Sequence, residues 1–292
     1  MIPAQAVTAL RALRYHRTPA QRALTEADAR AFIDEVGFCF LFGERSVEMP
    51  TLWGAICGGD RPPSDDREDA DLGRAWEWKD SLPARGEVYY GKLLHGKPTF
   101  VSLALLPAFY ALSPNYGDVD DYLQQYEEGL LTIEARNIYA ALLENGPLST
   151  SRLRQLSGLQ GGGAVARRFD SAIAELQAQL KIAKTGISDA NYWGYAYVYD
   201  LFLRAFPSVP EQARAISTDT AMDTILTQHL HNTVAQPAAR LRRLFGWEEW
   251  DWDRLLARLV ADGVLATDVV IEGVRGPQLV LTATLHELEE HA

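Results

Sequence analysis

The sequence predicts an α+β, mostly helical protein built of tandem winged helix-turn-helix units with short β-hairpins. Two observations predict this class. Apolar residues recur at three- and four-residue spacing along many segments, which is typical of amphipathic helices. Three of these helix-rich regions end in short β-branched or aromatic runs separated by turn residues, which is typical of hairpins. We therefore expect three units, at residues 1–115, 116–206 and 207–292, related by pattern and hardly by residue identity.

The central unit has the clearest pattern. Residues 161–186 read GGGAVARRFDSAIAELQAQLKIAKTG, in which the apolar stripe from Val165 to Leu180 predicts a helix. Ile182 to Gly186 then predict a strand and a turn. Two helices are predicted before this stretch, Thr132–Glu144 and the short Ser151–Leu156. Helix, short helix, longer helix and hairpin is the order of a winged helix-turn-helix domain.

The two outer units are expected to end in the same way, with a helix followed by a hairpin. The predicted helices are Leu72–Trp78 in the first unit and Trp252–Val260 in the last. The predicted strand pairs are Val88–Leu93 with Thr99–Leu103, and Val264–Ile271 with Gln278–Thr282.

The charge is acidic but unevenly distributed. The chain has 39 Asp and Glu against 28 Lys and Arg, a net charge of -11. This argues against a generic polyanion binder, because phosphate contacts need clustered basic residues. Residues 1–22, however, hold four arginines and no acid, whereas residues 58–80 hold eight acids and four bases. The N-terminal arginines fit either a DNA-seeking arm or a docked helix, and the helix is the preferred interpretation.

The remaining composition excludes several classes. Two cysteines, Cys39 and Cys57, make neither a disulfide framework nor a structural zinc site and suit a reducing compartment. The longest apolar run, Val101–Leu112, is too short to span a bilayer. No secretory signal or phosphate-binding glycine loop is recognisable, and His229 and His231 have no third ligand nearby. We expect a cytoplasmic protein with no membrane contact, metal or cofactor.

Basic residues of the central unit are the candidate contacts to double-stranded DNA. Arg167 and Arg168 open the predicted recognition helix, where they would reach phosphates or base edges in a major groove. The other candidates are Lys181 and Lys184 in the wing, and Arg152 and Arg154 on the preceding short helix. For each of them the alternative is an ordinary solvated side chain.

Two stretches resemble the AlkZ/YcaQ-type DNA glycosylase family, whose members remove alkylated or crosslinked bases. Tyr195–Pro207, YAYVYDLFLRAFP, is similar to the family segment R-x-Y-x-L-x-E-R-x-x-P. The matching residues are Tyr199, Leu201, Arg204 and Pro207. Trp78–Pro83, WKDSLP, resembles the family's W-x-x-x-S-L-x-P with one residue fewer before the serine and one residue fewer before the proline. The resemblance extends over about residues 20–285 and implies tandem winged helices in a C-shape with a β-rich cap, and a role in DNA repair.

The same resemblance implies a missing catalytic pair. Family enzymes carry Gln-x-Gln or Gln-x-Asp after a glycine that follows the first long helix, and these side chains position the water and stabilise the developing cation. Here the stretch Gly37–Phe42 reads GFCFLF and places Phe40 and Phe42 at the pair. Phenyl rings perform neither task. The resemblance therefore implies a glycosylase-like scaffold without the family's catalytic pair.

Two alternatives stay open. An active glycosylase would need substitute carboxylates, for which Glu77 and Asp80 are the candidates, since Trp76 and Trp78 flank Glu77 as a flipped-base pocket would require. The ordinary interpretation of both is an exposed helix carboxylate. The other alternative is a protein-interaction scaffold or transcriptional regulator built of winged helices, which the net charge of -11 suits. A protein partner is thus a further expectation.

Overall fold

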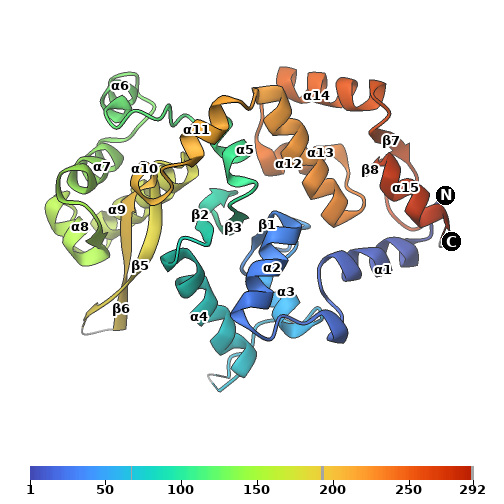
Figure 1. The fold of residues 1–292 in the computed structure, drawn as a ribbon, viewed down its shortest axis with the longest axis horizontal. Helices are drawn as coiled ribbons and strands as arrows, with labels where there is room; N and C mark the ends of the chain where they lie inside the picture. The colour runs from blue at the N-terminus through green and yellow to red at the C-terminus, as the bar shows by residue number, and fades with distance from the viewer. Residues whose placement is uncertain (67, 192–193, 291–292) are drawn as a thin grey trace. The chain divides into compact units, whose positions relative to one another are not determined.

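The computed structural model describes residues 1–66, 68–191 and 194–290, and it is mostly helical with short antiparallel hairpins (Figure 1). This confirms the predicted fold class. The chain forms two compact units, one of residues 1–76 and 217–292 and one of residues 77–216. Within the described ranges, no helix is both long enough and apolar enough to cross a membrane.

The first unit combines the two ends of the chain. Its N-terminal elements are α1 Ala4–Arg14, the 3-10 helix η1 Pro19–Gln21, α2 Glu26–Val36, β1 Phe38–Phe40, α3 Leu52–Cys57 and the start of α4 Ala70–Ala84. Its C-terminal elements are α12 Thr218–Thr233, α13 Ala238–Phe245, α14 Glu249–Ala261, β7 Leu265–Val269, β8 Gln278–Leu281 and α15 Thr282–Glu290. Capping by Thr25 and Ser217 begins α2 and α12, because each side chain accepts a backbone N–H of the first turn.

Backbone pairing holds the chain ends together. The amide of Ile2 donates to Val270 O at 3.0 Å, and the amide of Glu272 donates to Ile2 O at 2.9 Å. Helix α1 packs against α12 and α15, and Figure 1 shows α1 and α15 near the N and C labels. Arg11 and Arg14 of α1 donate to backbone carbonyls of Thr233 and His231. The N-terminal arginines therefore belong to a docked helix, as preferred from the sequence.

The second unit contains the predicted central helices and hairpin. Its elements are β2 Val88–Leu94, β3 Lys97–Ser102, α5 Leu106–Ala111, α6 Asp121–Glu127, α7 Ile133–Asn145, β4 Leu148–Ser149, α8 Thr150–Leu156, α9 Ala164–Ala178, β5 Ile182–Asn191, β6 Gly194–Leu201, α10 Phe202–Ala205 and α11 Val209–Arg214. Strand β4 pairs with β6, which pairs with β5, so the short strand before α8 joins the hairpin after α9. This is the element order predicted for a winged helix.

One core cluster explains why these elements pack together. It gathers the apolar stripe of α9, including Phe169, Ile173 and Leu176, against Ile138 and Leu142 of α7. Burial of such stripes supplies most of the stability of short helices. The stripe also leaves the first turns of α9 free to project their arginines away from the core.

The compact units group elements that pack together, whereas the predicted units follow the repeated helix-and-hairpin pattern, so the predicted boundaries stay a prediction. The predicted boundaries lie at 115/116 and 206/207, and the chain passes from one compact unit to the other at 76/77 and 216/217. The helix-then-hairpin pattern is a local signal, but compactness depends on long-range pairing such as Ile2 with Val270. The order α12, α13, α14, β7, β8 also repeats the helix-and-hairpin pattern at the C-terminus. A tandem winged-helix organisation stays a prediction.

Candidate nucleic-acid interface

Two arginines project from the start of α9. Gly163, with φ of 59°, precedes the helix, and Arg167 and Arg168 are both exposed. Arg168 Nη1 lies 3.3 Å from Glu134 Oε1. Among the described residues, the Arg167 side chain has no hydrogen-bond or ion-pair partner. Both arginines border a shallow hollow of about 360 Å³ that also has Thr132 and Glu175 on its wall.

The arginines of α8 differ from each other in their surroundings. Arg152 is exposed and its Nη1 donates to Gln155 Oε1 at 2.5 Å. Arg154 is half-buried, with Nη2 at 2.9 Å from Asp170 Oδ1 and its guanidinium 4.2 Å from the centre of the Phe169 ring. Arg152 thus has no carboxylate to displace before it meets a phosphate, whereas Arg154 is held by an ion pair and a ring.

Lys181 is not a wing contact. Its side chain is 1% exposed, and its Nζ donates to Asp121 Oδ1 at 2.7 Å. Burial lowers the pKa of Lys181 despite this carboxylate. The sequence suggested an exposed strand lysine because Lys is rarely buried. The buried partner, 60 residues away in α6, reverses that expectation.

Lys184 is also buried, and it forms a cluster with Lys79 and Asp80. Lys184 is 3% exposed, and its Nζ donates to Asp80 Oδ1 and, at 3.2 Å, to the backbone oxygen of Lys79. Lys79 Nζ donates to the same Asp80 oxygen at 2.6 Å. The ring of Tyr197 lies 4.0 Å below Lys184 Nζ. Burial lowers the pKa of Lys184 to about 8. Both predicted wing lysines are therefore interior ion-pair residues.

The same cluster corrects the expectation for Asp80. Asp80 is buried, and its Oδ1 accepts from two buried ammonium groups, so it is an interior ion-pair residue and not an exposed helix carboxylate. Glu77, by contrast, is exposed one turn earlier on α4. Trp78 is buried and Trp76 is 46% exposed, so the two tryptophans do not form one pocket around Glu77.

The two phenylalanines aligned with the catalytic pair are packing residues. Phe40 is buried in β1. Phe42 is half-buried, with its ring centre 5.8 Å from that of Trp53 and 5.7 Å from that of Trp76. An aromatic cluster therefore occupies the position where the resemblance implies polar side chains.

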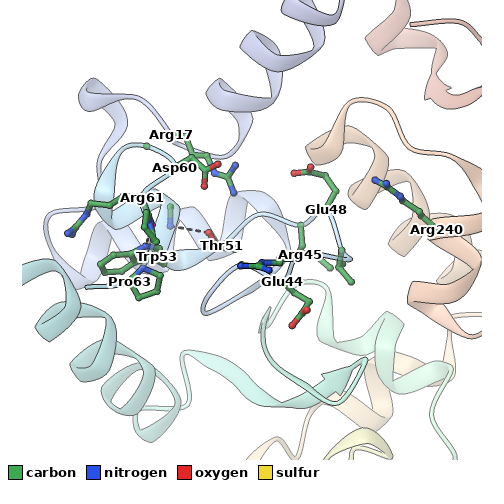
Figure 2. A pocket seen from close by; sticks show the side chains of 16 residues that line it. Arg17, Glu44, Arg45, Glu48, Thr51, Trp53, Asp60, Arg61, Pro63 and Arg240 are labelled. Atoms are coloured by element: carbon green, nitrogen blue, oxygen red, sulfur yellow. Dashed lines mark hydrogen bonds between the residues drawn. The ribbon is translucent and has the colours of Figure 1, made fainter. Parts of the chain in front are cut away.

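A pocket in the first unit has a polar lining that sequence reasoning did not single out (Figure 2). It measures about 590 Å³. Its charged lining residues are Arg17, Glu44, Arg45, Glu48, Asp60, Arg61 and Arg240. The only signal in the sequence was the acid-free N-terminal segment that contains Arg17. Within the described residues, no group of three His, Cys, Asp or Glu side chains is arranged to hold a metal.

Comparisons with known proteins agree on the kind of scaffold. A family model described as AlkZ related matches residues 24–246. The structure resembles the Streptomyces sahachiroi DNA glycosylase AlkZ with a TM-score of 0.59 at 14% sequence identity. The superposition covers 99% of this chain and 72% of that protein. No curated protein matches the sequence.

Proposed function

Since this chain belongs to the AlkZ-related family, we propose that it binds double-stranded DNA on a tandem winged-helix scaffold and lacks the family's catalytic pair. Its role would lie in the repair of alkylated or crosslinked bases. The observation that carries the proposal is the exposure of Arg167 and Arg168 in the first turns of α9, the helix that follows the short helix α8. In helix-turn-helix proteins the second helix enters the major groove with its N-terminal residues toward the bases.

The surroundings of these arginines predict weak, salt-sensitive binding. Arg152 and Arg167 have no carboxylate partner among the described residues, whereas Arg168 and Arg154 are paired with Glu134 and Asp170. Few phosphates are therefore neutralised, and the acidic net charge opposes approach at low ionic strength. Each phosphate contact makes the negative slope of log K against log salt steeper by about 0.9.

A salt series with duplex DNA tests this interface. Arg167→Ala combined with Arg168→Ala should weaken binding across DNA sequences and flatten the salt slope by about 1 to 2. The matched control is Arg85→Ala with Arg214→Ala, which removes the same charge from exposed arginines of the same unit that pair with Glu87 and Glu211. An equal change in the control, or an unchanged slope in the test variant, would contradict the assignment.

The absence of the catalytic pair is tested in the same tubes. We expect no release of alkylated base from a duplex that the protein binds, because Phe40 and Phe42 offer no polar group to a water molecule. Base release that Glu77→Gln abolishes would show that a substitute carboxylate works. Failure to bind duplex DNA at low salt would overturn the proposal and favour a protein-interaction scaffold.

A further inference from the structure

We propose that the pocket of the first unit binds a phosphate-bearing ligand of nucleotide size, held by Arg17, Arg45 and Arg240. This inference does not depend on DNA binding by α9, which belongs to the other unit. The volume of the pocket, about 590 Å³, lies in the range of small-molecule sites and exceeds what one phosphate needs.

The ion pairs around the pocket leave an excess of positive charge. Glu48 lies 3.4 Å from Arg11, and Arg61 lies 2.6 Å from Asp69 and 3.2 Å from Asp71. Glu44 is engaged in an interaction of its own. Among the charged side chains that line the pocket, Arg17, Arg45, Arg240 and Asp60 have no ion pair within the described ranges. Three guanidinium groups thus lie around the same pocket as the carboxylates of Asp60 and Glu44, in a protein whose net charge is -11.

Packing fixes the guanidinium of Arg17 before any ligand arrives. It lies over the ring of Tyr15, 4.8 Å from the ring centre. Its Nε is buried and has no hydrogen-bond partner among the described residues. A Cβ at Gly54 would stand 3.0 Å from this atom, so the absence of a side chain there is what admits Arg17.

The other two arginines come from separate segments. Arg45 lies in the loop after β1, and Arg240 lies on α13. Figure 2 shows their side chains on different sides of the pocket from Arg17. Guanidinium is planar and donates paired hydrogen bonds that match the geometry of phosphate oxygens. Three such groups around one cavity favour a dianionic phosphomonoester or a phosphodiester of nucleic acid over a neutral ligand.

Isothermal titration calorimetry with the full chain tests the inference. The probes are inorganic phosphate, a nucleoside 5′-monophosphate and a short DNA duplex. The test variant is Arg45→Ala with Arg240→Ala, since both residues are exposed and their truncation leaves the core unchanged. The control is Arg30→Ala with Arg275→Ala, which removes the same charge from exposed residues of the same unit outside the pocket.

We expect saturable binding of at least one probe, about 10- to 100-fold weaker in the test variant and within about twofold in the control. Loss of monophosphate binding in the test variant would identify a free nucleotide as the source of the phosphate. Loss confined to the duplex would identify the nucleic-acid backbone. No saturable binding of any probe, or an equal loss in the control, would overturn the inference.

The same experiment separates this inference from the proposed function. Arg167→Ala with Arg168→Ala should leave monophosphate binding unchanged, because these residues lie in the other unit. Binding of monophosphate without binding of duplex would support the pocket and contradict the proposed function. Binding of duplex that responds only to the α9 variant, with no saturable binding of monophosphate or inorganic phosphate, would support the proposed function and contradict the pocket.

Discussion

Lys184 and Asp80 form a buried ion pair between residues 104 positions apart in the sequence, and this pair joins β5 to α4. Lys79 shares the same carboxylate oxygen. Two ammonium groups removed from water carry a large desolvation cost, which only a well-placed carboxylate and polar neighbours offset. Asp80 is therefore the residue on which this part of the second unit depends.

Replacement of Asp80 by Asn should lower the free energy of unfolding by about 3–5 kcal/mol, because it leaves buried ammonium groups without a counter-charge. Urea denaturation measures the change. Glu77→Gln is the matched control, since this carboxylate is exposed on the same helix, and its effect should stay within about 0.5 kcal/mol. Similar losses in the two variants would mean that the cluster is not buried as described.

His229 should make stability fall below neutral pH. The side chain is fully buried, stacked on Phe38 with ring centres 5.8 Å apart. Burial, helped by the charge of Arg11, lowers the pKa of His229 to about 3. An unfolded histidine titrates near pH 6.5. Between about pH 6.5 and 3 the unfolded chain therefore binds a proton that the folded chain does not. The free energy of unfolding falls as the pH is lowered through this range, by up to ~1.4 kcal/mol per pH unit.

His229→Phe removes this proton uptake and should flatten the dependence of unfolding free energy on pH between 6.5 and 4. Thermal or urea unfolding at several pH values measures it. Carboxylates also titrate in the lower part of this pH range. The quantity compared is therefore the difference in unfolding free energy between the variant and the parent protein at each pH. The same substitution at His286, which is exposed on α15, should leave the difference constant. A constant difference for His229→Phe would contradict the assignment.

The central helices could be predicted closely because their signals are local. The predicted helices Thr132–Glu144 and Ser151–Leu156 correspond to α7 Ile133–Asn145 and α8 Thr150–Leu156. Their apolar residues and capping residues lie within one or two helical turns of each other. These helices can therefore be predicted without knowledge of any distant contact. The fold class followed from the same kind of signal.

The burial of the lysines and the arginine pocket could not be predicted, because both depend on residues far apart in sequence. Asp121 and Lys181 are separated by 60 positions, and the sequence around either residue does not predict that the two are paired. The pocket gathers Arg17, Arg45 and Arg240 from three segments. Long-range pairing, such as that of Ile2 with Val270, also brings the two ends of the chain into one compact unit.

Thr132→Ala should weaken the contact between the start of α7 and α9 and lower the free energy of unfolding, which urea denaturation measures. The amide and hydroxyl of Thr132 donate to the carboxylate of Glu175 at 2.9 and 2.6 Å, and its hydroxyl oxygen accepts from the amide of Ala135. Loss of the cap and of the hydroxyl bond should cost about 1–2 kcal/mol of unfolding free energy. Thr224→Ala, at an exposed position inside α12, should change it by less than about 0.5 kcal/mol. Equal effects would contradict a special role for Thr132.

Two helical glycines should respond to alanine with opposite signs. A Cβ at Gly54 in α3 would meet Thr51 Oγ1 at 2.9 Å and Arg17 Nε at 3.0 Å, whereas a Cβ at Gly73 in α4 would meet nothing within 4 Å. Alanine is the better helix former by about 1 kcal/mol, so Gly73→Ala should stabilise the protein by roughly 0.5–1 kcal/mol. At Gly54 the crowding costs about 1–3 kcal/mol and outweighs that gain.

Urea denaturation of the two variants measures these signs. Gly54→Ala should also weaken phosphate binding, because the side chain of Arg17 must shift from its place beside Gly54 to admit the methyl group. Gly73→Ala, which lies outside the pocket lining, should leave phosphate binding unchanged. Stabilisation by both substitutions would contradict the close approach of Arg17 to Gly54. A loss of stability without a loss of phosphate binding would show that Arg17 is a packing residue and not a ligand contact.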